Sequence, residues 1–209
     1  MIEQKHNQII LLDFDHTLFN TTHFVNRLQE VFHSLGVDHA EFHEHRHTLH
    51  DMYTTDEISQ FIEKLSFVDK KSLHEIIHTT IENEARHFVF DDVNDFLLRH
   101  QDHFDLVILT HGDYELQSEK ILHSNFVVKL PSVIVPKEKY MAIAEFTERY
   151  EKIYFVDDMT ENIDSAKKSY PTIQTYFMQR DLDKPYANIS STCDCADYVI
   201  TNLQLNLEK

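Results

Sequence analysis

The sequence has few of the residues that cross-link a chain or bend it sharply. It holds only two cysteines, Cys193 and Cys195, together with two glycines and four prolines. A lone Cys-x-Cys pair cannot complete a four-ligand zinc site, and its close spacing suits a structural disulfide poorly. We therefore interpret both cysteines as reduced thiols in a reducing compartment.

Long apolar runs and an excess of positive charge are also missing. No run approaches the roughly 20 apolar residues of a membrane-spanning helix, and the polar start of the chain is unlike a signal peptide. The formal net charge of −17 would repel nucleic acids and anionic membranes. We expect a cytoplasmic protein that binds neither. A phosphate site in such a protein would need a metal ion or a lysine nearby.

Apolar runs typical of buried strands alternate with helical patterns from about residue 90 onward. The predicted strands are 8–14, 104–110, 132–135, 153–156, 173–177 and 198–200, and the predicted helices among them are 91–99, 114–122, 137–150 and 161–169. This alternation predicts an α/β fold with a parallel sheet covered on both faces. Ligands of such sheets bind beyond the carboxyl ends of the strands. The chemistry is therefore expected directly after the apolar runs.

A long helical segment separates the first two predicted strands. Apolar residues from 25 to 35 recur at helical spacing, and Gly36 is placed to end that helix. Further helices are predicted at 38–50, 55–65 and 70–84.

Four histidines in this segment would share one helix face. They are His39, His43, His47 and His50, and they fall within one arc if the helix is regular. We interpret this face as a solvated polar surface, with metal binding as the alternative.

Two pairs of carboxylates follow predicted strands. Asp13 and Asp15 lie where the first strand ends. Alternate residues of a strand point to the same side, so these two side chains can share a site. Asp157 and Asp158 follow the strand at 153–156. Close carboxylates repel unless a cation or a shared proton compensates, and Mg²⁺ prefers oxygen ligands. The alternatives are solvated aspartates in a turn and a helix N-cap at Asp158.

Donors suited to phosphate follow two other strands. Thr110, His111 and Gly112 come where the strand at 104–110 ends. A hydroxyl followed by N–H groups of a glycine-containing turn suits phosphate oxygens, although Thr110 could instead cap the next helix. Lys137 and Lys139 lie near a predicted helix start, and an ammonium group suits a phosphoryl anion, although either lysine could be solvated.

The order of these clusters resembles the haloacid dehalogenase (HAD) superfamily. The first motif of that family, Asp-x-Asp-x-Thr, matches Asp13, Asp15 and Thr17. The second motif, an apolar strand that ends in Thr or Ser, matches Thr110. The family often has glycine at the position of His16.

The third and fourth motifs match in the same order. A lysine near a helix start corresponds to Lys139 or Lys137, and an acidic pair after an apolar strand corresponds to Asp157 and Asp158. We choose Lys139 because Ile143 follows it in the usual Lys-x-x-x-apolar pattern, although Met141 gives Lys137 a similar claim. The fourth motif of the family often reads Gly-Asp, so Asp157 at its first position departs from the usual family pattern.

The resemblance implies an architecture. It implies a Rossmann-like parallel sheet core flanked by helices, formed by residues 1–17 and 88–209, with a helical cap at 18–87 inserted after the first strand. Such a cap acts as a lid that excludes water and limits what fits beneath it.

The resemblance also implies roles for the motif residues. Asp13 would attack phosphorus and form an aspartyl phosphate, while Asp15 would protonate the leaving alkoxide and then activate water. Mg²⁺ would bind Asp13, the backbone carbonyl of Asp15 and Asp158, with Asp157 as a further candidate. Thr110, His111, Gly112 and the motif lysine would hold phosphoryl oxygens.

We therefore predict a Mg²⁺-dependent phosphatase that acts on a small phosphorylated metabolite. The presence of Asp15 favours phosphoester cleavage over dehalogenation, because a halide leaves without a proton. Two alternatives stay open. One is a phosphomutase or other phosphotransferase with the same residues, and the other is a catalytically silent binding module on this fold.

Overall fold

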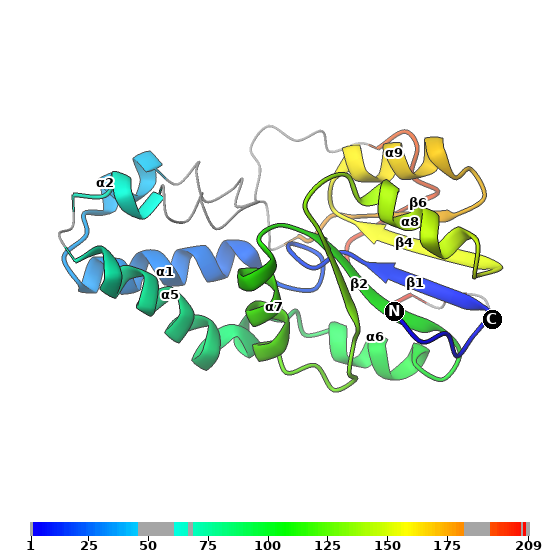
Figure 1. The fold of residues 1–209 in the computed structure, drawn as a ribbon, viewed down its shortest axis with the longest axis horizontal. Coiled ribbons are helices and arrows are strands. Elements are labelled where there is room, and N and C mark those ends of the chain that lie inside the picture. Colours follow the sequence, from blue (N-terminus) through cyan, green and yellow to red (C-terminus); the bar gives the residue numbers. More distant parts are fainter. Residues whose placement is uncertain (1, 46–60, 67–68, 182–192, 206, 208–209) are drawn as a thin grey trace.

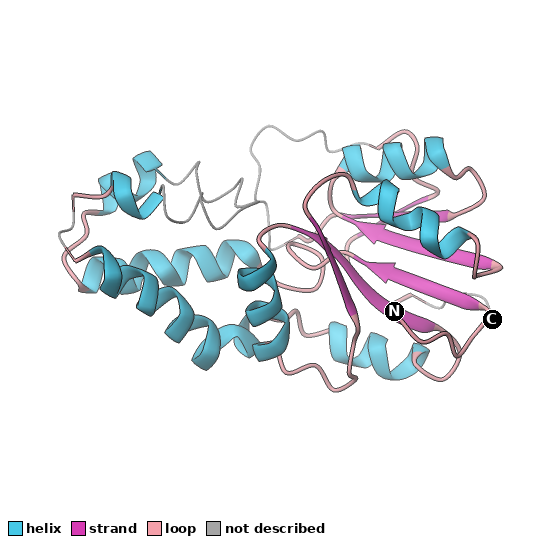
Figure 2. Ribbon diagram, viewed as in Figure 1, coloured by secondary structure: helices cyan, strands magenta, loops and turns pink. Residues whose placement is uncertain are grey.

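The structure is a computed structural model that describes residues 2–45, 61–66, 69–181, 193–205 and 207. A sheet with flanking helices forms one end of the molecule, and a group of helices extends from it at the other end (Figures 1 and 2). Among the described helices, none combines the length and the apolar character that crossing a bilayer requires.

Six parallel strands form one sheet in the order β3-β2-β1-β4-β5-β6. They are β1 (Gln8–Leu12), β2 (Asp105–His111), β3 (Ser132–Val135), β4 (Lys152–Asp157), β5 (Gln174–Met178) and β6 (Tyr198–Ile200). The central strand β1 pairs with β2 on one side and β4 on the other. The predicted α/β fold with a parallel sheet is confirmed.

Helices cover both faces of the sheet (Figure 1). α6 (Val93–His100) and α7 (Tyr114–His123) lie on one face, and α8 (Lys139–Thr147) and α9 (Thr160–Ser169) lie on the other. Alternate residues of β1 point to opposite faces. Ile10 and Leu12 therefore pack into the core under α6 and α7, while Ile9 and Leu11 pack into the core under α8 and α9.

The helices between β1 and α6, called the inserted helices below, precede β2 in the chain. They include α1 (Thr21–Ser34), α2 (His39–His45), α5 (Lys70–Glu84) and the 3-10 turn η1 (Ala85–Phe88). Asn20 and Asp69 cap α1 and α5, because their side chains accept hydrogen bonds from the backbone N–H groups of His23 and Ser72. Apolar residues of α1 and α5 join the core that lies under α6 and α7.

The histidine face is described in part. His47 and His50 lie outside the described residues. The ring of His39 lies against that of His33, with 3.8 Å between centroids and an angle of 30° between the ring planes, and Gln29 Nε2 lies 3.1 Å from His39 Nδ1. Among the described residues, no three metal-ligating side chains come together at this face. The described histidines thus form a polar surface and add no support for metal binding.

Several element ends differ from their predicted positions by a few residues, and two of these differences lie at the carboxyl edge of the sheet. The first strand was expected to reach Phe14, but it ends at Leu12 because the Phe14 carbonyl turns to accept the N–H groups of Leu18 and Phe19, each at 2.9 Å. The helix expected from Lys137 begins at Lys139, where the extended backbone of Glu138 changes to helical. Both shifts place polar residues at the carboxyl edge of the sheet.

Candidate active site

Asp13 lies at the centre of the carboxyl edge, directly after β1. Its backbone N–H donates to the Val156 carbonyl at 2.9 Å, which continues the pairing with β4. Its side chain is 5% exposed and accepts a hydrogen bond from the Lys139 ammonium group. Burial raises the pKa of Asp13, Lys139 opposes that effect, and nearby Asp157 adds to it, so that the pKa is about 6.

The turn after Asp13 has a strained residue at His16. Its φ of 59° lies in the left-handed region that favours glycine, and its side chain is buried and lines a cavity. The buried guanidinium of Arg180 donates twice to the Thr17 carbonyl, at 2.7 and 3.1 Å, and once to Asp92. The end of β5 therefore holds this turn in place.

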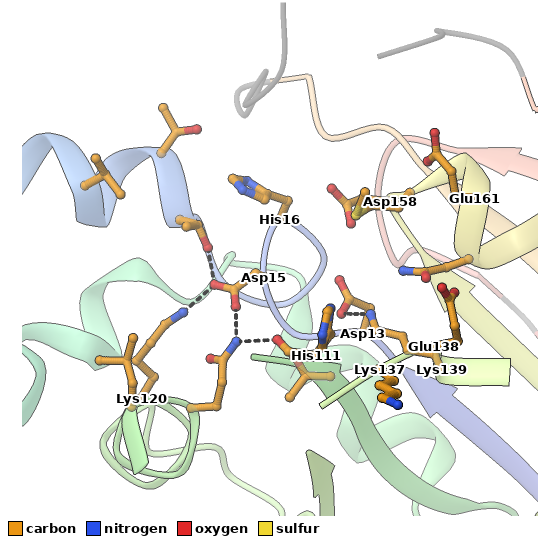
Figure 3. A pocket seen from close by; sticks show the side chains of 18 residues that line it. Asp13, Asp15, His16, His111, Lys120, Lys137, Glu138, Lys139, Asp158 and Glu161 are labelled. Carbon is orange, nitrogen blue, oxygen red and sulfur yellow. Dashed lines mark hydrogen bonds and ion pairs between the residues drawn. The ribbon is translucent and has the colours of Figure 1, made fainter. Parts of the chain in front are cut away.

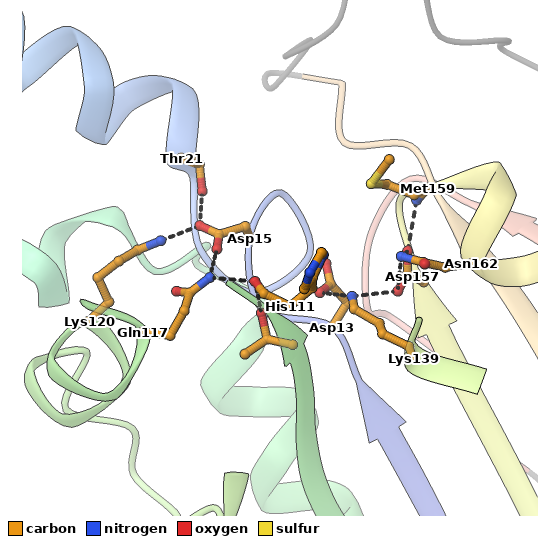
Figure 4. A network of polar contacts seen from close by, with 11 residues as sticks. Asp13, Asp15, Thr21, His111, Gln117, Lys120, Lys139, Asp157, Met159 and Asn162 are labelled. Carbon is orange, nitrogen blue, oxygen red and sulfur yellow. Dashed lines mark hydrogen bonds and ion pairs between the residues drawn. The ribbon is translucent and has the colours of Figure 1, made fainter. Parts of the chain in front are cut away.

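Lys139 joins the first and fourth motifs. Its ammonium group donates to Asp13 and, at 2.7 Å, to Asp157 (Figure 4). Asp157 also accepts hydrogen bonds from the Met159 N–H and from the side-chain amide of Asn162. Burial lowers the pKa of Lys139, but the charges of the two carboxylates outweigh burial and raise it. Lys139 is therefore a charged, fixed group beside Asp13.

Lys137 has a different position. It lines the same cavity but is exposed, whereas Lys139 is 4% exposed. Of the two lysines left open by the sequence, the structure brings Lys139 to Asp13 and leaves Lys137 at the rim (Figure 3).

Three carboxylates could hold a divalent cation. Oxygens of Asp13, Asp157 and Asp158 lie within 4.8 Å of one another. Burial, followed by the charges of Asp13 and Asp157, raises the pKa of Asp158 well above its ordinary value. This excess negative charge fits a hard cation with oxygen ligands. Because Asp157 already accepts from Lys139, Met159 and Asn162, Asp13 and Asp158 are better suited as direct ligands.

The second motif lies at the end of β2. Thr110 is 1% exposed and lines the cavity together with His111. The Gly112 N–H donates to the Val135 carbonyl at 3.4 Å. That donor therefore faces β3, so Thr110 and His111 are better candidates for phosphate contacts than Gly112.

Asp15 lines the opposite side of the cavity from Lys139 (Figure 3). Its carboxylate accepts hydrogen bonds from Thr21 of α1 and from Lys120 of α7, and from Gln117 Nε2 at 2.6 Å. Burial raises the pKa of Asp15, but the charge of Lys120 and the three hydrogen bonds outweigh it and lower the pKa to about 2. Asp15 is therefore ionised in this arrangement.

The cavity between these groups has a volume of about 410 Å³. Side chains from strand ends, the inserted helices and α7 line it together (Figure 3). They include Asp13, Asp15, Thr21, Thr110, Lys139 and Asp158. A buried carboxylate held by a fixed ammonium group, a hydroxyl and further carboxylates thus face one small space.

Solved structures resemble the whole chain. A haloacid dehalogenase-like hydrolase from Burkholderia xenovorans LB400 has a TM-score of 0.77 at 18% identity, with 95% of this chain and 94% of that chain covered. The chain has a HAD-like fold. A HAD-hydrolase from Bacillus subtilis bound to magnesium has a TM-score of 0.63 at 16% identity, with 95% and 96% covered. A beta-phosphoglucomutase from Thermotoga maritima has a TM-score of 0.62 at 15% identity, with 93% and 94% covered.

These similarities establish the HAD-like fold, and the fold serves more than one reaction. L-2-haloacid dehalogenases are also among the structural neighbours. The sequence matches no protein-family model and no curated protein. Its reaction must therefore be argued from its own side chains.

Sequence reasoning missed the residues that hold Asp15. Lys120 and Gln117 are 3% and 4% exposed, and both lie on the helix predicted at 114–122. A signal was present: Lys120 follows Leu116 by four residues and so shares its buried face. A lysine on a buried helix face requires a partner.

Gly112 makes room for one of these residues. At a φ of +143°, an added Cβ would lie 2.9 Å from Gln117 Nε2 and 3.1 Å from its Cγ. We expect Gly112→Ala to lower the free energy of unfolding by about 1–3 kcal/mol, through backbone strain and displacement of Gln117. Urea denaturation measures this. Gly36→Ala is the matched control, because Gly36 has a φ of +100° but nothing within 4 Å of its added Cβ. An equal fall in the free energy of unfolding in both variants would show that displacement of Gln117 contributes nothing.

Proposed function

We propose that the protein is a hydrolase that cleaves the phosphate ester of a small metabolite through an aspartyl phosphate on Asp13. The observation that carries this proposal is the pairing of Asp13 with Lys139 at a cavity that Asp15 and Thr110 also line. A buried carboxylate held by an ammonium group is oriented for attack, and the same ammonium group can interact with incoming phosphoryl oxygens.

The reaction would proceed in two displacements. Asp15, which is ionised at rest, would first take a proton from the monoanion of the phosphate ester. An oxygen of Asp13 then attacks phosphorus, the bond from phosphorus to the ester oxygen breaks, and the leaving oxygen takes that proton from Asp15. Water then attacks the phosphoryl group and gives its proton to Asp15, while the bond to Asp13 breaks and inorganic phosphate leaves. Thr110 and Lys139 would stabilise the phosphoryl oxygens in both steps.

Asp13 and Asp158, with the backbone carbonyl of Asp15, would hold Mg²⁺. When bound, it would neutralise charge on the phosphoryl group and on the clustered carboxylates. The Bacillus subtilis structure was solved with magnesium, which supports the same ion here.

The size of the cavity supports a small substrate. About 410 Å³ is near the lower end of ligand pockets, and it lies where the inserted helices meet the sheet. The net charge of −17 disfavours a polyanion such as nucleic acid. A phosphorylated metabolite with a compact carbon skeleton fits both observations.

The test is hydrolysis of p-nitrophenyl phosphate with and without divalent cations. Its leaving group needs little protonation, which suits an Asp15 that is ionised at rest. We expect activity with Mg²⁺, loss of at least about 100-fold after chelation, and recovery when Mg²⁺ is added back. Undiminished turnover after exhaustive chelation would contradict the metal assignment.

A panel of phosphorylated metabolites, sugar phosphates and 2-haloacids then distinguishes the competing reactions. Release of phosphate from metabolites supports the hydrolase, whereas isomerised sugar phosphates without phosphate release would indicate a phosphomutase. Halide release from a 2-haloacid without phosphatase activity would indicate a dehalogenase. Inactivity toward all three, with ligand binding retained, would indicate a silent binding module.

A further inference from the structure

Asp15 is held from two structural units at once. Thr21 belongs to the first turn of α1, in the inserted helices, whereas Gln117 and Lys120 belong to α7 on the sheet. Thr21 and Lys120 both donate to Oδ1, and Gln117 donates to Oδ2. Both carboxylate oxygens thus accept hydrogen bonds, and the carboxylate has one defined orientation (Figure 4).

Lys120 lies in an apolar environment. Its Nζ is 4.9 Å from the ring centroid of Phe19, 5.2 Å from that of Phe14 and 5.9 Å from that of Phe24. Among the described residues, its ion pair is with Asp15. Removing an ammonium group from water is unfavourable, and an apolar side chain of similar length would fill such a site at least as well. Packing alone therefore does not account for a lysine here.

Gln117 connects Asp15 to the second motif. Its Nε2 donates to Asp15 and also, at 3.0 Å, to the His111 carbonyl. His111 ends β2 and follows Thr110, the candidate phosphate ligand. One amide group therefore fixes the distance between the carboxylate of the first motif and the turn of the second.

We propose that Lys120 and Gln117 are positioning residues that set the orientation of Asp15 for its work as acid and base. This inference rests on the proposed function. Lys120 acts through Asp15, because its charge is already paired with that carboxylate. α7 thereby contributes to the chemistry although none of its residues belongs to the four motifs.

The test is a double-mutant cycle between Lys120→Met and Asp15→Asn. Methionine has a similar length and suits the Phe14, Phe19 and Phe24 surroundings, so the fold should persist. With p-nitrophenyl phosphate and Mg²⁺, we expect Lys120→Met to lower kcat about 10–100-fold with KM nearly unchanged, because a small misplacement of a catalytic group has effects of this size. In the Asp15→Asn background the same change should alter kcat less than about twofold.

Lys71→Met serves as the control. That lysine lies on α5 with its side chain 86% exposed, so its removal should leave kcat unchanged. An equal loss from Lys120→Met in both backgrounds would overturn the inference, because it would show an effect that does not pass through Asp15.

A second measurement is independent of turnover. Crystal structures of the wild type and of Lys120→Met should show the Asp15 carboxylate turned away from its wild-type position in the variant. An Asp15 that keeps its orientation without Lys120 would overturn the inference even if no phosphatase activity were found. Absence of phosphatase activity in the wild type would instead count against the proposed function.

Discussion

Asp13→Asn is expected to lower turnover by at least about 10⁴-fold while the protein stays folded. An amide is a poor nucleophile, so the first displacement cannot occur. The fold should persist because asparagine has nearly the same shape and because one charge is removed from a cluster of three carboxylates. Lys139 keeps its hydrogen bond to Asp157.

The measurement pairs kcat for p-nitrophenyl phosphate with thermal unfolding. Asp102→Asn, at an exposed turn position, is the matched control and should be fully active. A folded Asp13→Asn protein that retains most of its activity would contradict the assignment of Asp13 as the nucleophile.

Lys139→Ala is expected to produce the second large loss, about 10²–10³-fold in kcat. The variant loses the donor that orients Asp13 and that would stabilise phosphoryl charge. It also leaves two buried carboxylates without their cation, so the free energy of unfolding should fall by about 3–5 kcal/mol. Bound Mg²⁺ should offset part of this fall.

Lys137→Ala is the comparison that decides between the two lysines. Lys137 is exposed at the cavity rim, so its removal should weaken substrate binding slightly and leave stability unchanged. Kinetics and unfolding of both variants are measured in Mg²⁺. A larger loss of kcat at Lys137 than at Lys139 would show that the assignment is wrong.

The apolar runs predicted the sheet well because a strand buried on both faces needs a continuous apolar segment. The ends of these apolar runs also indicated which polar residues would lie at the site, including Asp13, Thr110 and Asp157. Their convergence followed from strand geometry, since parallel strands end at a common edge. The α/β fold could therefore be predicted from local pattern alone.

The partners of Asp15 could not be predicted in this way. Whether Lys120 reaches Asp15 depends on how α7 packs against the turn after β1, and no local pattern encodes that contact. Lys137 and Lys139 were equally hard to separate, because each is followed four residues later by an apolar residue. The helix start at Lys139 decides which side chain enters the core. Asp157 and Asp158 are adjacent in the sequence, and the structure distinguishes them because Asp158 lines the cavity while Asp157 is buried and accepts hydrogen bonds from its neighbours.

The position of β1 in the sheet has a consequence for synthesis of the chain. Ile9 pairs with Asp105 and with Ile153, so β1 leaves the ribosome long before either of the strands that flank it. Until then both of its edges are open, and such non-local pairing is slow and prone to aggregation. The pairing of β1, which leads into Asp13, is thus completed only after the whole of β4, up to Asp157, has emerged. We therefore expect truncated chains that lack β4 to have no part of the active site formed, because Asp13 has no paired strand to hold it.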